Sequence, residues 1–160
     1  MAIRFFSSRF GELEVSEEKV ISAPEGIIGF PDYHRYVLLD PSGGTSPFLW
    51  LQAVDSPDLA FVITDPLQFV PNYHILASEP ALERLGASSK PPPALFVIVT
   101  VPAGNPDKTS INLLAPLVYF ANENVLYQIV LEKADWPIRH YLFPQESSEA
   151  SKTAETGGMK

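Results

Sequence analysis

The chain has 160 residues, no cysteine, and nineteen acidic against eleven basic residues, which gives a net charge of −8. This length predicts one domain, and the lack of cysteine excludes a disulfide framework, a thiolate zinc site and a cysteine nucleophile. The negative charge argues against direct binding to a nucleic-acid backbone and favours attraction to basic partners. The sequence contains neither an apolar run that would span a membrane nor the apolar core of a secretory signal, so we expect a cytoplasmic protein.

Apolar runs separated by prolines predict a chain built mainly of strands. Sixteen prolines recur at short intervals up to Pro144 and would interrupt any long helix. In "ELEV", Leu13 and Val15 alternate with two glutamates, which is the period of a half-buried strand. The expected strands, in chain order, are 2–6, 12–15, 36–39, 48–54, 60–64, 73–76, 94–101, 113–120 and 125–131, and the first two form a hairpin.

One segment has the signals of an α-helix, and the C-terminal end has those of a disordered tail. In "SEPALERLG", Ser78 is suited to the N-cap, Pro80 to the first turn and Gly86 to the C′ position. Shorter helical turns are expected at "EEKV", after Ser16, and at "DYHRY". Residues 145–160 contain no aromatic side chain and cannot bury enough surface to order themselves. We therefore expect a folded domain over 1–144 and a disordered tail over 145–160.

The strands "AFVIT" and "ALFVIVTV" are apolar on both faces, which is typical of strands that are covered on both sides. A sheet that curls onto itself provides such cover and also hides the edges of many apolar strands. The sequence therefore predicts an all-β fold, a small antiparallel β-barrel-like domain with one or two short helices.

The residues that usually carry catalysis or bind metals do not form a recognisable motif. The chain lacks a Gly-x-Ser-x-Gly elbow, and its histidines, His34, His74 and His140, are too far apart for a His-x-His or His-x-x-x-His pair. A triad or a site of one histidine with scattered aspartates would have to assemble in space. Gly26 and Gly29 in "PEGIIGFPDY" predict a tight loop with positive φ that lets the following phenylalanine enter the core. We expect no catalytic residue, metal or cofactor.

Several carboxylates and amides are candidates for partner contacts. Asp55 and Asp58 bracket Ser-Pro, and Asp65 precedes a proline, so all three are turn formers first. If they cluster on one rim, they would form a negative patch for a basic partner. Asn112 and Gln128 are amides inside apolar runs, where each must either bond a neighbouring loop or face a partner.

Four segments in this order resemble the family of the flagellar assembly factor FliW. They are "EGIIGFPDYHRYVLL" at 25–39, "FLWLQAVDSPDLAFVITDP" at 48–66, "SINLLAPLVY" followed by "YQIVL" within 110–131, and "WPIRHYL" at 136–142. The resemblance extends from about residue 2 to residue 143. Two departures are Ser110, where the family usually has threonine, and Tyr127, where it often has a basic residue before the glutamine.

The resemblance implies a cytoplasmic, non-catalytic binding protein with a small antiparallel β-barrel-like fold. Members of that family bind flagellin, and they antagonise the translational regulator CsrA allosterically, away from its RNA-binding surface. Flagellin synthesis is thereby coupled to flagellin secretion. For this chain we expect flagellin and CsrA as partners, no direct contact with nucleic acid or membrane, and a monomer. The candidate partner-binding residues are Asp55, Asp58, Asp65, Phe69, Asn112 and Gln128, and the apolar loop residues Ile27 and Ile28 are further contacts.

Two other readings stay open. A small-ligand-binding β-barrel, or an enzyme on that fold, would need a deep pocket with converging polar groups around His74 or His140. A structural domain that self-associates through exposed strand edges would be oligomeric in solution.

Overall fold

The computed structural model describes residues 1–74, 92–131 and 135–144. These residues form eleven strands and three short 3-10 turns, and none of them is in an α-helix. The strands are β1 (Ala2–Ser7), β2 (Gly11–Ser16), β3 (Ile21–Ser22), β4 (Arg35–Leu39), β5 (Phe48–Ala53), β6 (Ala60–Thr64), β7 (Ala94–Thr100), β8 (Ser110–Ile111), β9 (Leu117–Phe120), β10 (Val125–Gln128) and β11 (His140–Tyr141). The turns are η1 (Glu17–Lys19), η2 (Pro66–Gln68) and η3 (Pro106–Lys108).

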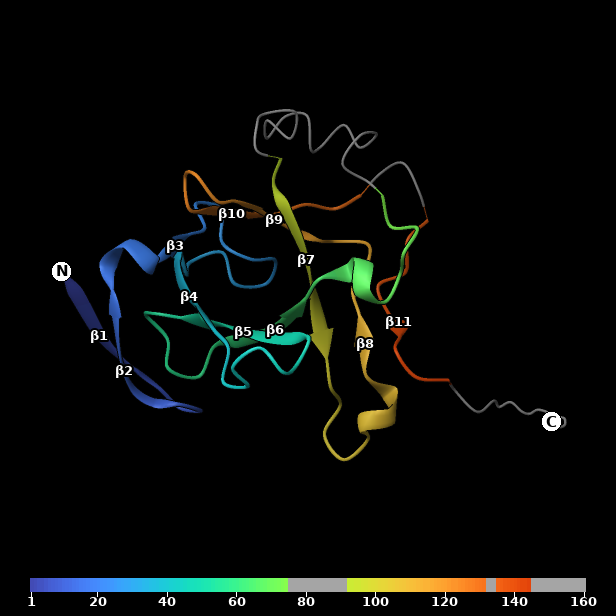
Figure 1. Cartoon of the computed structure of the whole chain (residues 1–160), viewed down its shortest axis with the longest axis horizontal. Coiled ribbons are helices and arrows are strands. Elements are labelled where there is room, and N and C mark those ends of the chain that lie inside the picture. Colours follow the sequence, from blue (N-terminus) through green and yellow to red (C-terminus); the bar gives the residue numbers. More distant parts are fainter. Residues whose placement is uncertain (75–91, 132–134, 145–160) are drawn as a thin grey trace, which may run out of the picture.

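Seven of these strands close into a barrel (Figure 1). Their order is β7-β6-β5-β4-β3-β10-β9, and β9 pairs again with β7 to complete the ring. On this edge of β7, residues 94–96 pair with β9 and residues 99–100 pair with β8. Strand β11 then pairs with β8. The predicted all-β, barrel-like fold is therefore confirmed.

The barrel is mixed rather than purely antiparallel. Strand β10 runs parallel to β3, through the pair Val125 and Ser22, while the other pairs are antiparallel. The cause is topological: strand directions cannot alternate all the way around a ring with an odd number of members. The expectation of an antiparallel barrel was therefore wrong at this one pair.

Side chains alternate between the inside and the outside of the barrel and form two cores. The inner core consists of Ile21, Ala23, Ile27, Tyr36, Leu51, Ala53, Ile63, Leu117 and Leu126. The outer core lies between the barrel wall and the segments that cross it, and consists of Val70, Tyr73, Val97, Val99, Ile111, Leu113, Val118, Phe120, Ile129 and Leu131. Strand β7 supplies side chains to both, which confirms the prediction from its doubly apolar sequence.

The predicted N-terminal hairpin forms a separate two-stranded sheet, β1 with β2, at one side of the barrel (Figure 1). Its glutamates face solvent, and Glu14 lies 3.6 Å from Arg4 on the opposite strand. Phe10 packs edge-on against Trp50 of β5, and the guanidinium of Arg9 lies 4.3 Å from the centre of the same indole.

The structure differs from the predicted elements mainly where elements are short. Strands β3, β8 and β11 were not predicted, because two residues carry no periodicity. Tyr73 and His74 are not in a strand, and the rest of the predicted strand 73–76 lies outside the described residues. The turn at "EEKV" forms as η1, whereas "DYHRY" forms no helical turn. The predicted helix within 78–86 and the predicted tail over 145–160 also lie outside the described residues.

Candidate functional site

Asp55 forms an ion pair with Arg35 at the start of β4. Arg35 places its Nη2 at 2.5 Å and its Nε at 3.1 Å from the two carboxylate oxygens. The hydrogen bonds from the guanidinium hold the pKa of Asp55 below its usual range, and the same contact raises the pKa of Arg35. Both side chains are about half exposed, so the pair joins the start of β4 to the turn between β5 and β6 at the surface.

Asp58 ties the same turn to the N-terminal hairpin. Its carboxylate accepts a hydrogen bond from the hydroxyl of Ser8, and the backbone N–H of Ser8 donates to the carbonyl of Pro57 at 2.9 Å. The sequence reading of "DSPD" as a turn is thus supported by contacts that hold a second element in place.

A buried glutamine that the sequence reading missed organises this junction. Gln52 is fully buried, and its Oε1 accepts a hydrogen bond from the hydroxyl of Ser7 at 2.8 Å. Its amide nitrogen has two protons to share among four carbonyls of the turn. These belong to Ala53, Ser56, Pro57 and Leu59, at 3.0 to 3.4 Å. The available signal was a single amide in "FLWLQAV", the same signal that drew attention to Gln128.

Asp65 and Phe69 lie at the other end of β6. Asp65 caps η2 by accepting a hydrogen bond from the N–H of Leu67 at 3.0 Å. Phe69 is partly buried and stacks on Phe48, with ring centres 5.9 Å apart. Asp55 and Asp58 precede β6 and Asp65 follows it, so the three carboxylates lie at opposite ends of this strand and not on one rim.

The structure brings Asn112 and Gln128 together around the segment 112–116. The Oδ1 of Asn112 accepts hydrogen bonds from the N–H groups of Leu114 and Ala115, each at 3.1 Å. Gln128 donates to the carbonyl of Ala115 at 3.0 Å and accepts from the N–H of Ile28 at 2.8 Å. Both amides therefore tie down loops, and the Asn112 turn explains why β9 begins at Leu117 instead of at 113.

The loop 26–30 turns through two glycines in the left-handed region. Gly26 and Gly29 have φ values of +70° and +92°, as their spacing predicted. The core residue, however, is Ile27, which is 2% exposed, whereas Phe30 is 39% exposed and contacts Phe61 edge-on. Two expectations were therefore wrong: Phe30 is not the core residue, and Ile27 is not available at the surface. Ile28 is exposed.

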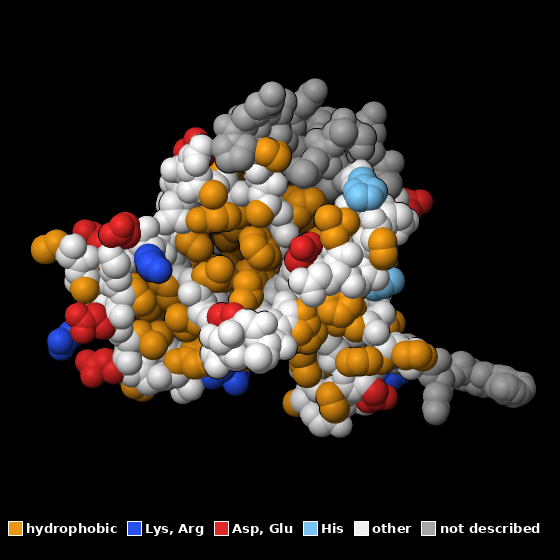
Figure 2. Space-filling view, viewed as in Figure 1, with side chains coloured by type: hydrophobic (Ala, Val, Ile, Leu, Met, Phe, Trp, Pro, Cys, Tyr) orange, Lys and Arg blue, Asp and Glu red, His pale blue; other side chains and the backbone are white. Residues whose placement is uncertain are grey.

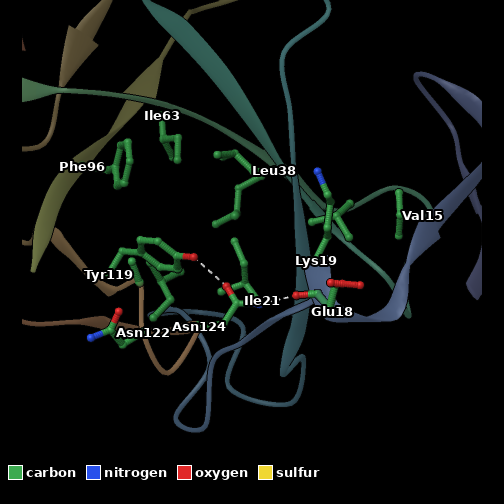
Figure 3. A pocket seen from close by; sticks show the side chains of 14 residues that line it. Val15, Glu18, Lys19, Ile21, Leu38, Ile63, Phe96, Tyr119, Asn122 and Asn124 are labelled. Carbon is green, nitrogen blue, oxygen red and sulfur yellow. Dashed lines mark hydrogen bonds between the residues drawn. The ribbon is translucent and has the colours of Figure 1, made fainter. Parts of the chain in front are cut away.

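One end of the barrel opens into a cavity of about 540 Å³. Each of the seven barrel strands contributes an inward-facing side chain to its wall. These are Ile21 of β3, Leu38 of β4, Leu51 of β5, Ile63 of β6, Phe96 of β7, Tyr119 of β9 and Leu126 of β10. Figure 3 labels those of β3, β4, β6, β7 and β9. Figure 2 shows hydrophobic side chains gathered in a hollow on this face, between β4 and β7. We call this cavity the barrel mouth.

Two segments form the polar part of the mouth's rim, η1 and the turn 121–124. Asn124 has a φ of 57° and joins them, because its amide donates to the carbonyls of Glu18 and Val20 at 3.1 and 2.8 Å. Its Oδ1 accepts a hydrogen bond from the hydroxyl of Tyr119 at 2.6 Å (Figure 3). The polar groups of Tyr119 and Asn124 are therefore already engaged with each other and with the backbone.

Neither His74 nor His140 lines the barrel mouth. Within the described ranges no three His, Asp or Glu side chains are grouped so as to hold a metal ion. Across the same ranges, no helix has the length and apolar character needed to cross a membrane.

Comparison with known proteins places the chain in a family. The model of the FliW protein family matches residues 4–142. The flagellar assembly factor FliW of Desulfitobacterium hafniense (strain DSM 10664 / DCB-2) is 40% identical over 151 residues, which cover 94% of this chain and 97% of that protein. The protein of the same name from Natranaerobius thermophilus is 36% identical, with 92% and 97% covered. A crystal structure of the flagellar assembly factor FliW superposes with a TM-score of 0.78 at 31% identity, over 90% of this chain and 99% of that one. This chain belongs to the FliW family.

Proposed function

We propose that the protein is a cytoplasmic flagellar assembly factor that binds flagellin and CsrA and has no catalytic activity. By occupying CsrA away from its RNA-binding surface, it relieves repression of flagellin synthesis, and accumulating flagellin reverses this by competing for the protein. The observation that carries the proposal is family membership over nearly the whole chain, at 40% identity to a flagellar assembly factor.

The charge and the polar contacts support a protein-binding role. A net charge of −8 favours encounter with a basic RNA-binding protein and disfavours RNA itself. The candidate residues Asp55, Asp58 and Asp65 hold turns in shape, which leaves partner contact as a secondary role for each of them separately. Phe69, Asn112 and Gln128 also remain candidate contacts with a partner.

Co-elution with purified partners tests this proposal. The protein, flagellin and CsrA from the source organism are mixed in pairs at micromolar concentration and separated by size-exclusion chromatography with mass measurement. We expect a complex with each partner and a monomer when the protein is alone. Binding to neither partner would show that the proposal is wrong, and a concentration-dependent oligomer would favour the self-association reading.

The barrel mouth is the one observation that favours the second candidate, a small-ligand-binding barrel. Such a site needs converging polar groups to orient the ligand. The polar groups of Tyr119 and Asn124 are bonded to protein atoms instead, and the histidines lie elsewhere. The remaining polar lining residues, Glu18, Lys19 and Asn122, are exposed at the rim and do not converge inside the mouth. We therefore rank this function second.

A further inference from the structure

We propose that the barrel mouth receives an apolar anchor side chain from a protein partner, on a segment in which basic residues flank that anchor. The inference rests on the proposed function and assigns it a site. It concerns residues that the sequence reading did not select, since the wall is drawn from strands spread over more than 100 positions of the chain.

The depth and lining of the mouth suit an apolar anchor. Leu51 and Ile63 are 1% exposed and lie deep in the wall, whereas Leu38 is 43% exposed at the opening. Of the seven inward-facing wall residues, Leu38 is the one that is exposed, while Phe96 and Tyr119 are partly buried and the other four are buried. A volume of about 540 Å³ lies within the range of about 300–1,000 Å³ found for ligand sites. A leucine, methionine or phenylalanine side chain would fill part of it and cover Leu38.

The rim explains why the occupant is a segment of a protein instead of a free small molecule. A small ligand depends on polar groups inside its pocket for orientation, and here those of Tyr119 and Asn124 bond each other and the backbone carbonyls of residues 18 and 20. The other polar side chains of the lining, Glu18, Lys19 and Asn122, lie on the exposed rim. A protein segment is oriented by contacts outside the pocket, because its flanking residues bind the surface around the opening while one side chain enters.

The charge of the rim selects the flanks. The segments η1 and 121–124 carry the carboxylates Glu17, Glu18 and Glu123 and the single ammonium of Lys19, a net charge of −2 from three negative and one positive groups. All four are exposed. Glu18 and Lys19 line the opening, and Glu17 and Glu123 lie on the same two segments directly beside lining residues. Lysine or arginine beside the anchor would complement this rim, and aspartate or glutamate would be repelled.

The test compares Leu38→Gln with a matched control, Val101→Gln. Val101 is 53% exposed, follows β7 and does not line the mouth. Both variants replace an exposed apolar side chain, and thermal unfolding checks that each stays folded. With flagellin and CsrA as ligands in isothermal titration calorimetry, we expect Leu38→Gln to weaken binding of at least one partner by about tenfold or more, and Val101→Gln to leave it within about twofold.

A second arm does not depend on either partner. Two short fluorescein-labelled peptides share a leucine and phenylalanine core and differ only in lysine or glutamate flanks, and their binding is followed by anisotropy. We expect the lysine peptide to bind, to release with added salt, and to lose affinity in Leu38→Gln but not in Val101→Gln.

The outcomes separate this inference from the proposed function. If wild-type protein binds a partner and Leu38→Gln binds it equally well, the mouth is not the site, while the proposed function stands. If neither partner binds, the proposed function is wrong and the peptide pair decides the inference alone. Failure of the lysine peptide in that case, or equal binding of the glutamate peptide, would overturn it.

Discussion

Individual polar groups in the two cores differ in whether the fold gives them a partner. The hydroxyl of Tyr73 donates to the carbonyl of Leu113 at 2.5 Å, whereas the buried hydroxyl of Tyr36 has no hydrogen-bond partner among the described residues. Burial raises the pKa of Tyr36 to about 12. A buried hydroxyl without a partner loses its hydrogen bonds to water on folding and gains none in their place. Removal of the hydroxyl should therefore affect the two tyrosines differently.

Replacing each tyrosine with phenylalanine makes this comparison. Tyr36→Phe should leave the free energy of unfolding unchanged or raise it, and Tyr73→Phe should lower it by about 1–3 kcal/mol, because a buried carbonyl loses its donor. Urea denaturation monitored by circular dichroism measures both. A loss in Tyr36→Phe as large as that in Tyr73→Phe would mean that the Tyr36 hydroxyl has a partner.

The buried amide of Gln52 should contribute more to the free energy of unfolding than an exposed amide does. Gln52→Leu removes the acceptor of the Ser7 hydroxyl proton and one donor to the turn carbonyls. We therefore expect a loss of about 1–3 kcal/mol and faster amide exchange in the hairpin. Gln68→Leu, on the exposed surface of η2, is the control and should change stability by less than about 0.5 kcal/mol. Equal effects would contradict the role assigned to Gln52.

The Asp55–Arg35 pair predicts a small dependence of stability on pH. The pKa of Asp55 is lowered in the fold from 3.8, so the unfolded chain takes up this proton first as the pH falls. The stabilisation is therefore complete above the unfolded value and is lost as the pH falls through the folded value. At pH 7, Asp55→Asn should cost less than about 1 kcal/mol, because the pair is half exposed. Denaturation of the wild type and Asp55→Asn at pH 7 and pH 3 checks this. A difference in their free energies of unfolding that is larger at pH 3 would contradict it.

At the scale of elements, long strands and turn residues could be predicted, and the shortest strands could not. The alternation in "ELEV" and the doubly apolar "ALFVIVTV" are local patterns, and both were read correctly. Strand β3 has two residues and exists because β4 and β10 lie beside it. Likewise, Gln52 and Gln128 have the same local signal, and only the tertiary fold decides that Gln52 becomes fully buried.

The loop 26–30 offers a prediction at this scale. A Cβ on Gly26 would lie 2.6 Å from the Cα of Pro31, whereas one on Gly29 would meet no atom within 4 Å. Both positions have positive φ, so alanine at either costs about 1–2 kcal/mol of backbone strain. Gly26→Ala should cost a further 1–3 kcal/mol or so, because backbone atoms must move. Chemical denaturation of the two variants measures the difference, and equal losses would show that the loop relaxes freely.

At the scale of the whole molecule, barrel closure creates the feature that no local pattern indicated. The sequence predicted a closed or nearly closed barrel, but the mouth depends on which residue of each strand stands at the open end. That register follows from all the strand pairings together. Most of the candidate partner residues chosen from the sequence instead form hydrogen bonds that fix turns and loops between the strands.

The central claim is that this chain acts by exchanging protein partners, and one competition measurement tests it most directly. CsrA is bound to a labelled RNA from the flagellin leader, the protein is added, and then flagellin is added, with anisotropy recorded throughout. We predict that the protein releases the RNA, that it does not bind the RNA by itself, and that flagellin restores the CsrA–RNA complex. RNA that stays bound to CsrA at saturating protein, or release that flagellin cannot reverse, would contradict the account.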